Sequence, residues 1–185
     1  MQEHIFLHDR FVCLTNEVIS GIECIPFERD WPGWWSKLEL WRRGLFTGQV
    51  AYFDLDTMFV RDCCDMFNVE RAFASLTNWS HPHRLASGVM AWQASDQLSV
   101  LFDSFKLEDV PRYALSQERW GDQGWIQDTL PIPFESLNEL HPGRIVSYKQ
   151  HVRAQGKVPG NASIVAFHGK PRPHQVNWEL PSGLY

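Results

Sequence analysis

Two carboxylates, Asp54 and Asp56, stand one residue apart directly after an apolar run that ends at Phe53. If the backbone there is extended, residues i and i+2 point the same way, and the two charges repel unless a cation lies between them. Oxygen ligands of this kind suit Mg²⁺ or Mn²⁺, which keep coordination positions for substrate phosphates. The pair therefore predicts a metal–phosphate site; the simpler alternative is a solvated acidic loop.

The apolar run itself, Val50 to Phe53, is rich in β-branched and aromatic residues, as is typical of a buried strand in a parallel sheet. Open α/β sheets bind ligands at the carboxyl ends of such strands. Further strands are predicted at 10–15, 21–27, 72–76, 88–92, 145–148 and 163–167, and helices at 34–43, 96–106 and 122–130. This alternation predicts an α/β sandwich around a mainly parallel sheet.

Length and composition predict an ordinary globular protein. A chain of 185 residues with 44% hydrophobic and 21% charged residues fits one domain, or one with an appendage. No segment approaches the roughly 20 apolar residues of a transmembrane span, and the first residues are too charged for a secretory signal. The four cysteines form no CxxC pair, so we expect reduced thiols in a cytoplasmic protein.

The net charge of −5 is unevenly distributed. Residues 140–178 contain no Asp or Glu but six basic residues, so all 22 acidic residues lie elsewhere. An acidic body with a basic C-terminal segment suits a metal–phosphate ligand. The overall acidity and the lack of a dense basic cluster argue against nucleic acid as a partner. Most of the nine tryptophans are expected in the core, although a flat ring in a cleft would suit stacking on a sugar.

The acidic motif, within 52–57, looks like the DxD motif of GT-A glycosyltransferases, and its surroundings are similar to the retaining, glycogenin-like family 8 and its bacterial relatives. Four further blocks occur in the family's order. Residues 35–38 resemble the helix before the DxD strand, and residues 86–91 resemble the strand beneath the sugar. Residues 120–124 resemble the Asp-Gln block beside the transferred sugar, and residues 164–171 resemble the terminal strand that binds the metal and the diphosphate.

The resemblance implies a single domain over 1–185 with a GT-A-like three-layer α/β/α sandwich, whose basic segment 140–178 closes the donor site. It also implies metal-dependent transfer of a sugar from a nucleotide-diphosphate sugar. A uridine diphosphate sugar is the family's usual donor, and the acceptor, whether glycan, protein or lipid, is not identified by the sequence.

The same resemblance assigns the metal and phosphate ligands. Asp54 and Asp56 would hold Mn²⁺ or Mg²⁺, with neutral His168 as the third ligand. Gly169 and Lys170 would hold the leaving phosphates, Lys170 as a point charge. The simpler alternatives are a structural histidine on a terminal strand and an exposed loop lysine.

On the sugar side, Asp122 would accept hydroxyls and Gln123 would face the anomeric carbon. Lys37 would reach the donor, and Ser87 and Gly88 would allow close approach beneath the sugar. The alternatives are a helix N-cap for Asp122, a surface lysine whose stem covers apolar rings for Lys37, and a plain strand with a tight packing point at Ser87 and Gly88.

The sequence departs from the family pattern at several points. Ala86 stands where the family has Asn, and Lys170 follows His168 by only two residues. Arg172 and His174 are assigned to the rim of the site. The chain is also N-terminally abbreviated, because 10–15 looks like the family's second strand. The nucleotide pocket would then lose its first strand and helix, and with them its contacts to the base.

A missing first strand would leave part of a sheet uncovered. We therefore expect one of three arrangements. Residues 1–7 cover the gap, a second copy pairs across it as a homodimer, or the chain is unstable alone.

Two other functions fit parts of the pattern. In haloacid-dehalogenase-like phosphatases the first Asp of such a motif is a nucleophile, but that pattern has Thr or Val where Met58 stands, and Gly121-Asp122 lacks the second acid at the right spacing. A glycosyltransferase-like remnant that binds a sugar, glycan or partner without turnover is the non-enzymatic alternative, favoured by Ala86 and the abbreviated start.

Overall fold

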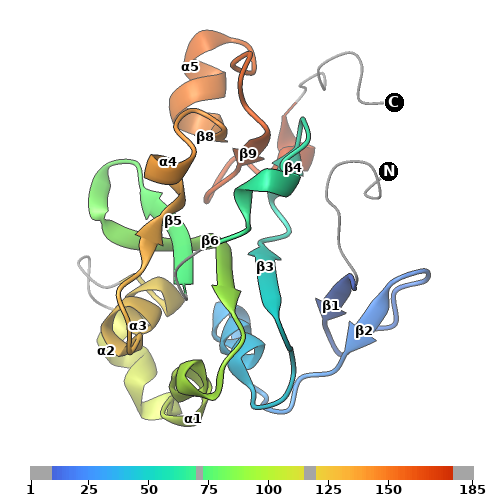
Figure 1. Ribbon diagram of the computed structural model, residues 1–185, viewed down its shortest axis with the longest axis vertical. Coiled ribbons are helices and arrows are strands. Elements are labelled where there is room, and N and C mark those ends of the chain that lie inside the picture. Colours follow the sequence, from blue (N-terminus) through green and yellow to red (C-terminus); the bar gives the residue numbers. More distant parts are fainter. Residues whose placement is uncertain (1–9, 70–72, 115–119, 177–185) are drawn as a thin grey trace. The chain divides into compact units, whose positions relative to one another are not determined.

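The computed structural model describes residues 10–69, 73–114 and 120–176 (Figure 1). The chain divides into two compact units. Unit 1 comprises Met1–Leu7, Gln49–Gln93 and Phe134–Tyr185, and unit 2 comprises His8–Gly48 and Ala94–Pro133. The single domain expected from the sequence stays a prediction. Residues 1–7, which cover the gap in one of the three expected arrangements, lie outside the described residues.

Unit 1 contains a four-stranded sheet with the order β3-β6-β5-β7. Its strands are β3 (Gln49–Phe53), β5 (Phe73–Asn78), β6 (His81–Gln93) and β7 (Glu135–Ser136). A two-residue turn joins β5 to β6, and the Asn78 side chain closes it by accepting from the N–H groups of Ser80 and His81 at 2.9 and 3.0 Å. This hairpin makes β5 and β6 antiparallel, and β6 also runs antiparallel to β3.

A three-stranded sheet with the order β4-β9-β8 completes the strands of unit 1. It contains β4 (Thr57–Phe59), β8 (Ile145–Ser147) and β9 (Ile164–Ala166). Short helical segments accompany the two sheets: η2 (Cys64–Met66), α4 (Leu137–Leu140), η5 (Tyr148–Val152), α5 (Arg153–Gln155) and η6 (Pro173–Gln175).

Alternating side chains of the two sheets form two apolar clusters in unit 1. The larger cluster combines residues of both sheets, including Leu76, Val89 and Ile164. The smaller one lies on the other face of the β4–β9 ladder and includes Val165, Phe167 and Val152. Apolar side chains therefore pack on both faces of β4 and β9. This packing fixes the backbone of β4, which directly follows the acidic turn.

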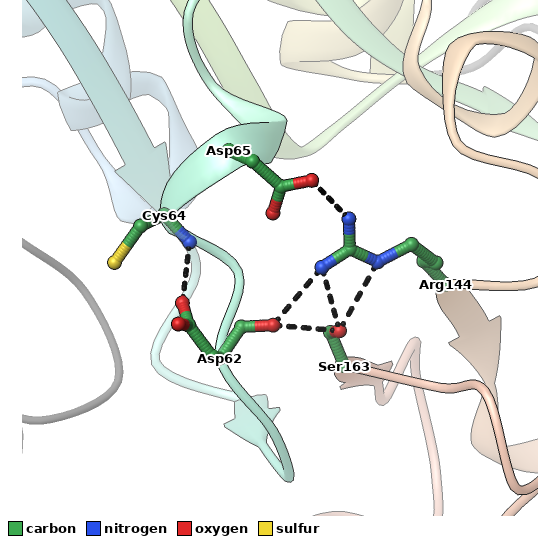
Figure 2. A network of polar contacts seen from close by, with 5 residues as sticks. All are labelled: Asp62, Cys64, Asp65, Arg144 and Ser163. Atoms are coloured by element: carbon green, nitrogen blue, oxygen red, sulfur yellow. Dashed lines mark hydrogen bonds and ion pairs between the residues drawn. The ribbon is translucent and has the colours of Figure 1, made fainter.

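Arg144 ties the segment after β4 to the strands β8 and β9 (Figure 2). Its guanidinium donates to the Asp65 carboxylate, to the Asp62 backbone carbonyl at 3.0 Å and to the Ser163 hydroxyl at 3.2 Å. Ser163 Oγ in turn donates to the same Asp62 carbonyl at 2.8 Å. The planar fork of arginine suits such a multiple contact. Arg144, one of the basic residues of the C-terminal segment, therefore has a structural role in this network rather than a role in ligand binding.

The four cysteines are all free, and Cys63 is fully buried in the larger cluster. Its burial, with the nearby charges of Cys64 and Asp62, raises the pKa of the Cys63 thiol to about 12. The folded state thus favours the neutral thiol. Cys63 therefore contributes stability that is complete below the ordinary thiol pKa, 9.0, and is lost as the pH rises towards about 12.

We predict that iodoacetamide at pH 8 modifies the adjacent, half-buried Cys64 first and modifies Cys63 only when the protein unfolds. Peptide mass spectrometry with and without denaturant measures this directly. Equal labelling of the two neighbours in the native protein would contradict the described burial of Cys63.

Unit 2 contains a parallel pair of short strands and a group of helical segments. They are β1 (Val12–Leu14), β2 (Glu23–Ile25), η1 (Gly33–Trp41), η3 (Asp96–Ser99), α1 (Val100–Asp103), η4 (Leu107–Asp109), α2 (Val110–Ala114) and α3 (Asp122–Thr129). Aromatic rings form its core, where Phe105 stacks on Trp35 with ring centres 4.8 Å apart and meets Trp125 edge-on at 5.2 Å. Trp35, Trp41 and Trp125 are buried in this core, whereas Trp34 is exposed.

The expected mixture of strands and helices is confirmed, but the mainly parallel sheet is not observed. Among the described strands three pairings are parallel and three are antiparallel. β3 lies at the edge of its sheet against antiparallel β6, which explains why its residues are only half-buried. The segment 33–41 is a 3₁₀ helix. The helix predicted at 96–106 ends at Asp103, and Lys106 is extended, with its N–H donating to the Asp109 side chain at 3.1 Å.

None of the helices in the described part of the chain is long and apolar enough to cross a membrane.

Candidate metal and phosphate site

Asp54 lies at the end of β3, where its N–H donates to the Gly88 carbonyl at 2.8 Å and extends the β3–β6 ladder by one residue. Its Oδ1 accepts from the Tyr52 hydroxyl at 2.5 Å, and its Oδ2 lies 3.5 Å from the position that a Cβ on Gly88 would take. The DxD strand and the strand expected beneath the sugar are therefore neighbours. Because side chains alternate along a strand, Ser87 points to the other face, where it is buried.

The acidic motif is a tight turn rather than the extended segment that its spacing suggests. The Thr57 N–H donates to the Asp54 carbonyl at 2.9 Å, which closes a β-turn with Leu55 fully exposed at its tip. Even so, the two carboxylates are electrostatically coupled. Burial and the charge of Asp54 raise the pKa of Asp56, while Arg172 lowers it, and the net direction is upward.

Arg172, assigned by sequence only to the rim, forms an ion pair with Asp56. Its Nη1 donates to Asp56 Oδ2, and its backbone N–H, at the start of η6, donates to the Gln175 side chain at 2.9 Å. The arginine side chain is half exposed, whereas that of Asp56 is mostly buried. A cation tethered to the chain thus neutralises one of the two candidate metal ligands.

The third candidate ligand, His168, is close to Asp56 along the backbone but not through its side chain. The Phe167 N–H donates to the Asp56 carbonyl at 3.0 Å, so Asp56 and Phe167 are opposite one another at the end of the β4–β9 ladder. Alternation then directs His168 to the other face. There its ring stacks on Trp79 with centres 5.5 Å apart, and its Nε2 shares a hydrogen bond of 2.7 Å with Ser147 Oγ.

The positions of these side chains show whether the three predicted metal ligands lie together. Within the described ranges, no group of three or more His, Cys, Asp or Glu side chains is arranged to hold a metal ion. The expected convergence of Asp54, Asp56 and His168 is therefore not seen. The two carboxylates still offer the oxygen donors that a hard divalent cation prefers, and their coupling favours a positive charge beside them.

The turn after β9 brings basic groups together. Gly169 adopts the left-handed conformation with φ of 67°, and Lys149 Nζ lies 3.3 Å from the position that a Cβ there would take. Lys170 is exposed beside it. Although His168 is exposed as a residue, the partial burial of its ring, followed by the charge of Lys149, lowers its pKa. These groups create a positive surface with a neutral imidazole.

The second group of predicted residues lies in unit 2. Lys37 Nζ, on η1, lies 3.0 Å from Asp122 Oδ2, on the first turn of α3, and each side chain is only 8% exposed. Gly121 precedes the helix with φ of 61°, and a Cβ there would approach Trp34 Nε1 to 2.7 Å. The sequence blocks 35–38 and 120–124 thus pack against each other. Asp122 is not the helix N-cap, because Gly121 occupies that position. Gln123 follows it on the same turn and is half-buried.

A comparison with protein-family models found no match for this chain, and a search among curated proteins found none either.

We predict that Gly88→Ala weakens Mn²⁺ binding without destabilising the fold. The backbone of Gly88 is not left-handed, and the new methyl would make an ordinary contact with Asp54 Oδ2 at 3.5 Å. It would nevertheless occupy the space beside that oxygen, while alanine in a strand is favoured over glycine by about 0.5–1 kcal/mol. Calorimetric titration with Mn²⁺ should show a severalfold lower affinity alongside an unchanged or higher melting temperature. Gly160→Ala, in open space, is the matched control; equal affinities in both variants would exclude Asp54 as a ligand on this side.

Proposed function

We propose that this chain is a metal-dependent glycosyltransferase of the GT-A type, with its mixed sheets arranged as a three-layer α/β/α sandwich. The observation that supports the proposal is that motif blocks far apart in the sequence contact one another. Asp54 is opposite Gly88, Asp56 is opposite Phe167, and Lys37 is paired with Asp122. Two of these contacts are backbone hydrogen bonds within unit 1, and the third is a buried ion pair within unit 2.

In this proposal, Asp54 and Asp56 hold Mn²⁺ or Mg²⁺, and the ion would neutralise the charge that grows on the leaving diphosphate. Gly169 and Lys170 bind the phosphates. His168, in its neutral form, orients the turn that carries them through its hydrogen bond with Ser147. The donor is a nucleotide-diphosphate sugar, with uridine as the base that the motif resemblance favours.

The sugar-facing role belongs to unit 2. Asp122 accepts hydrogen bonds from sugar hydroxyls, with its carboxylate oriented by Lys37 at 3.0 Å. Gln123, the next residue of α3, faces the reacting carbon. The acceptor is a glycan, protein or lipid, and the four free thiols support the cytoplasm as the compartment.

One observation favours a second candidate function, a remnant that binds a sugar or a partner without turnover. Arg172 already neutralises Asp56, and His168 is directed to Ser147 rather than to the aspartates. A protein that no longer needs a metal would tolerate both contacts.

Donor hydrolysis distinguishes the two functions. The protein is incubated with uridine diphosphate glucose and related nucleotide sugars with and without MnCl₂, and release of the nucleoside diphosphate is measured. The transferase is expected to release it only with metal, and Asp56→Asn is expected to abolish release. Asp30→Asn, which removes an exposed carboxylate of unit 2, should behave like the wild type. Sugar binding without any release would support the remnant, and release of phosphate from simple phosphomonoesters would favour the phosphatase alternative.

A further inference from the structure

Lys149 is a basic residue for which the sequence predicts no role. It belongs to η5, and its ammonium lies against the Gly169 turn, 3.3 Å from the position of a Cβ on that glycine. A side chain at residue 169 would be strained at φ of 67° and would also crowd Nζ. Glycine therefore keeps the backbone of this turn accessible on the side where the ammonium lies.

Two contacts fix the position of Lys149 relative to the turn. The ring of Tyr148 stacks on that of Phe167 with centres 4.4 Å apart and planes at 13°, which brings the residues that follow each of them, Lys149 and His168, together. The start of η5 is capped by Ser147, whose Oγ accepts from the Gln150 N–H at 3.2 Å and whose N–H donates to His151 Nδ1 at 2.9 Å. The stem of Lys149 thus begins from an ordered helical turn.

The two lysines beside this turn have no acidic partner among the residues that the structure describes. Neither Lys149 nor Lys170 forms an ion pair with any residue in the described part of the chain. The segment 140–178 has no carboxylate of its own, and Asp56, which lies across the ladder, is paired with Arg172. Two ammonium groups beside an accessible glycine turn attract a small anion with several oxygens.

We propose that Lys149, the backbone of Gly169 and Lys170 form a binding subsite for a phosphate group of a diphosphate, with Lys149 as a binding residue in addition to the predicted ones. The identity of the ligand as a nucleotide diphosphate rests on the proposed function. Lysine suits this task because its compact charge on a flexible stem can follow a phosphate that departs with the leaving group. The subsite itself needs neither the sugar nor the metal.

The test is calorimetric titration of the whole chain with sodium pyrophosphate in the absence of divalent metal. The wild type is expected to bind, and Lys149→Met is expected to bind about tenfold more weakly, as for the loss of one hydrogen bond to a charged group. Lys157→Met is the matched control, since Lys157 is an exposed lysine of the same basic segment, and it should equal the wild type. Lys149→Arg should retain most of the affinity, and added NaCl should weaken binding in every variant.

Two results would overturn the proposal: no binding of pyrophosphate by the wild type at millimolar concentration, or equal binding by Lys149→Met and Lys157→Met. Circular dichroism of each variant shows whether it is folded, and Lys149→Gln, a neutral polar replacement that should also bind about tenfold more weakly, keeps the test valid if Lys149→Met unfolds. The result is separable from the proposed function. Pyrophosphate binding that depends on Lys149, without metal-dependent donor hydrolysis, supports the subsite and rejects the transferase.

Discussion

Asp122→Asn is expected to destabilise the protein by about 3–5 kcal/mol, because Lys37 would retain a buried charge without its counter-ion. Both side chains are only 8% exposed, with 3.0 Å between the charged atoms. The cost should therefore far exceed that of an exposed ion pair. Urea unfolding of the wild type and variant measures the difference in free energy of unfolding.

A matched control is available in the same unit. Arg43 and Asp103 form an ion pair at 2.8 Å with side chains that are 59% and 43% exposed, so Asp103→Asn should cost no more than about 1 kcal/mol. If Asp122→Asn cost as little as Asp103→Asn, the Lys37–Asp122 pair would not be buried as described.

The double variant Lys37→Met/Asp122→Leu separates structure from function. Replacing both charges by apolar groups should restore most of the stability, since a buried ion pair is often no more stabilising than a hydrophobic pair. Donor hydrolysis should remain lost if Asp122 contacts the sugar. Recovery of hydrolysis together with stability would assign the pair a purely structural role.

Arg172→Gln is expected to raise the affinity for Mn²⁺. The arginine now neutralises Asp56, and its removal would release the Asp56 carboxylate, which is coupled to Asp54, from this ion pair. Because the pair is half exposed on the arginine side, the gain should be roughly fivefold, corresponding to about 1 kcal/mol. Calorimetric titration at constant ionic strength measures it.

Arg153→Gln removes an exposed arginine from α5 and is the control for the change in overall charge. It should leave the affinity for Mn²⁺ unchanged. A weaker affinity in Arg172→Gln than in this control would mean that the arginine orients Asp56 for the metal instead of competing with it.

Local features of the fold were accessible from the sequence. The apolar run 50–53 predicts β3, and Asp54 directly follows the strand as expected. The helix starting at Asp122 was also predicted, although its N-cap is Gly121, whose φ of 61° no simple pattern reveals. Contiguous hydrophobicity and helix-end residues are local signals, and they are sufficient for such elements.

Features that depend on distant residues were not predicted. The antiparallel β5–β6 hairpin turns at Trp79-Ser80, which lacks the usual Asn-Gly signal. The Arg172–Asp56 pair joins residues 116 positions apart, and the direction of the His168 side chain depends on which residue after β9 is opposite Asp56. The absence of Asp and Glu from 140–178 was the one available sign that basic residues of this segment, such as Arg172, would pair with acidic residues elsewhere in the chain.

The hydrogen bond from the Phe167 N–H to the Asp56 carbonyl has a consequence for observing the acidic turn in solution. This amide lies one residue beyond the last pair of the β4–β9 ladder, Thr57 and Ala166, so its protection from hydrogen exchange depends on the turn keeping its position. Exchange of a single amide, followed by NMR, would therefore report when the turn opens. The amide of Val165, in the middle of β9, provides the internal reference for opening of the whole ladder.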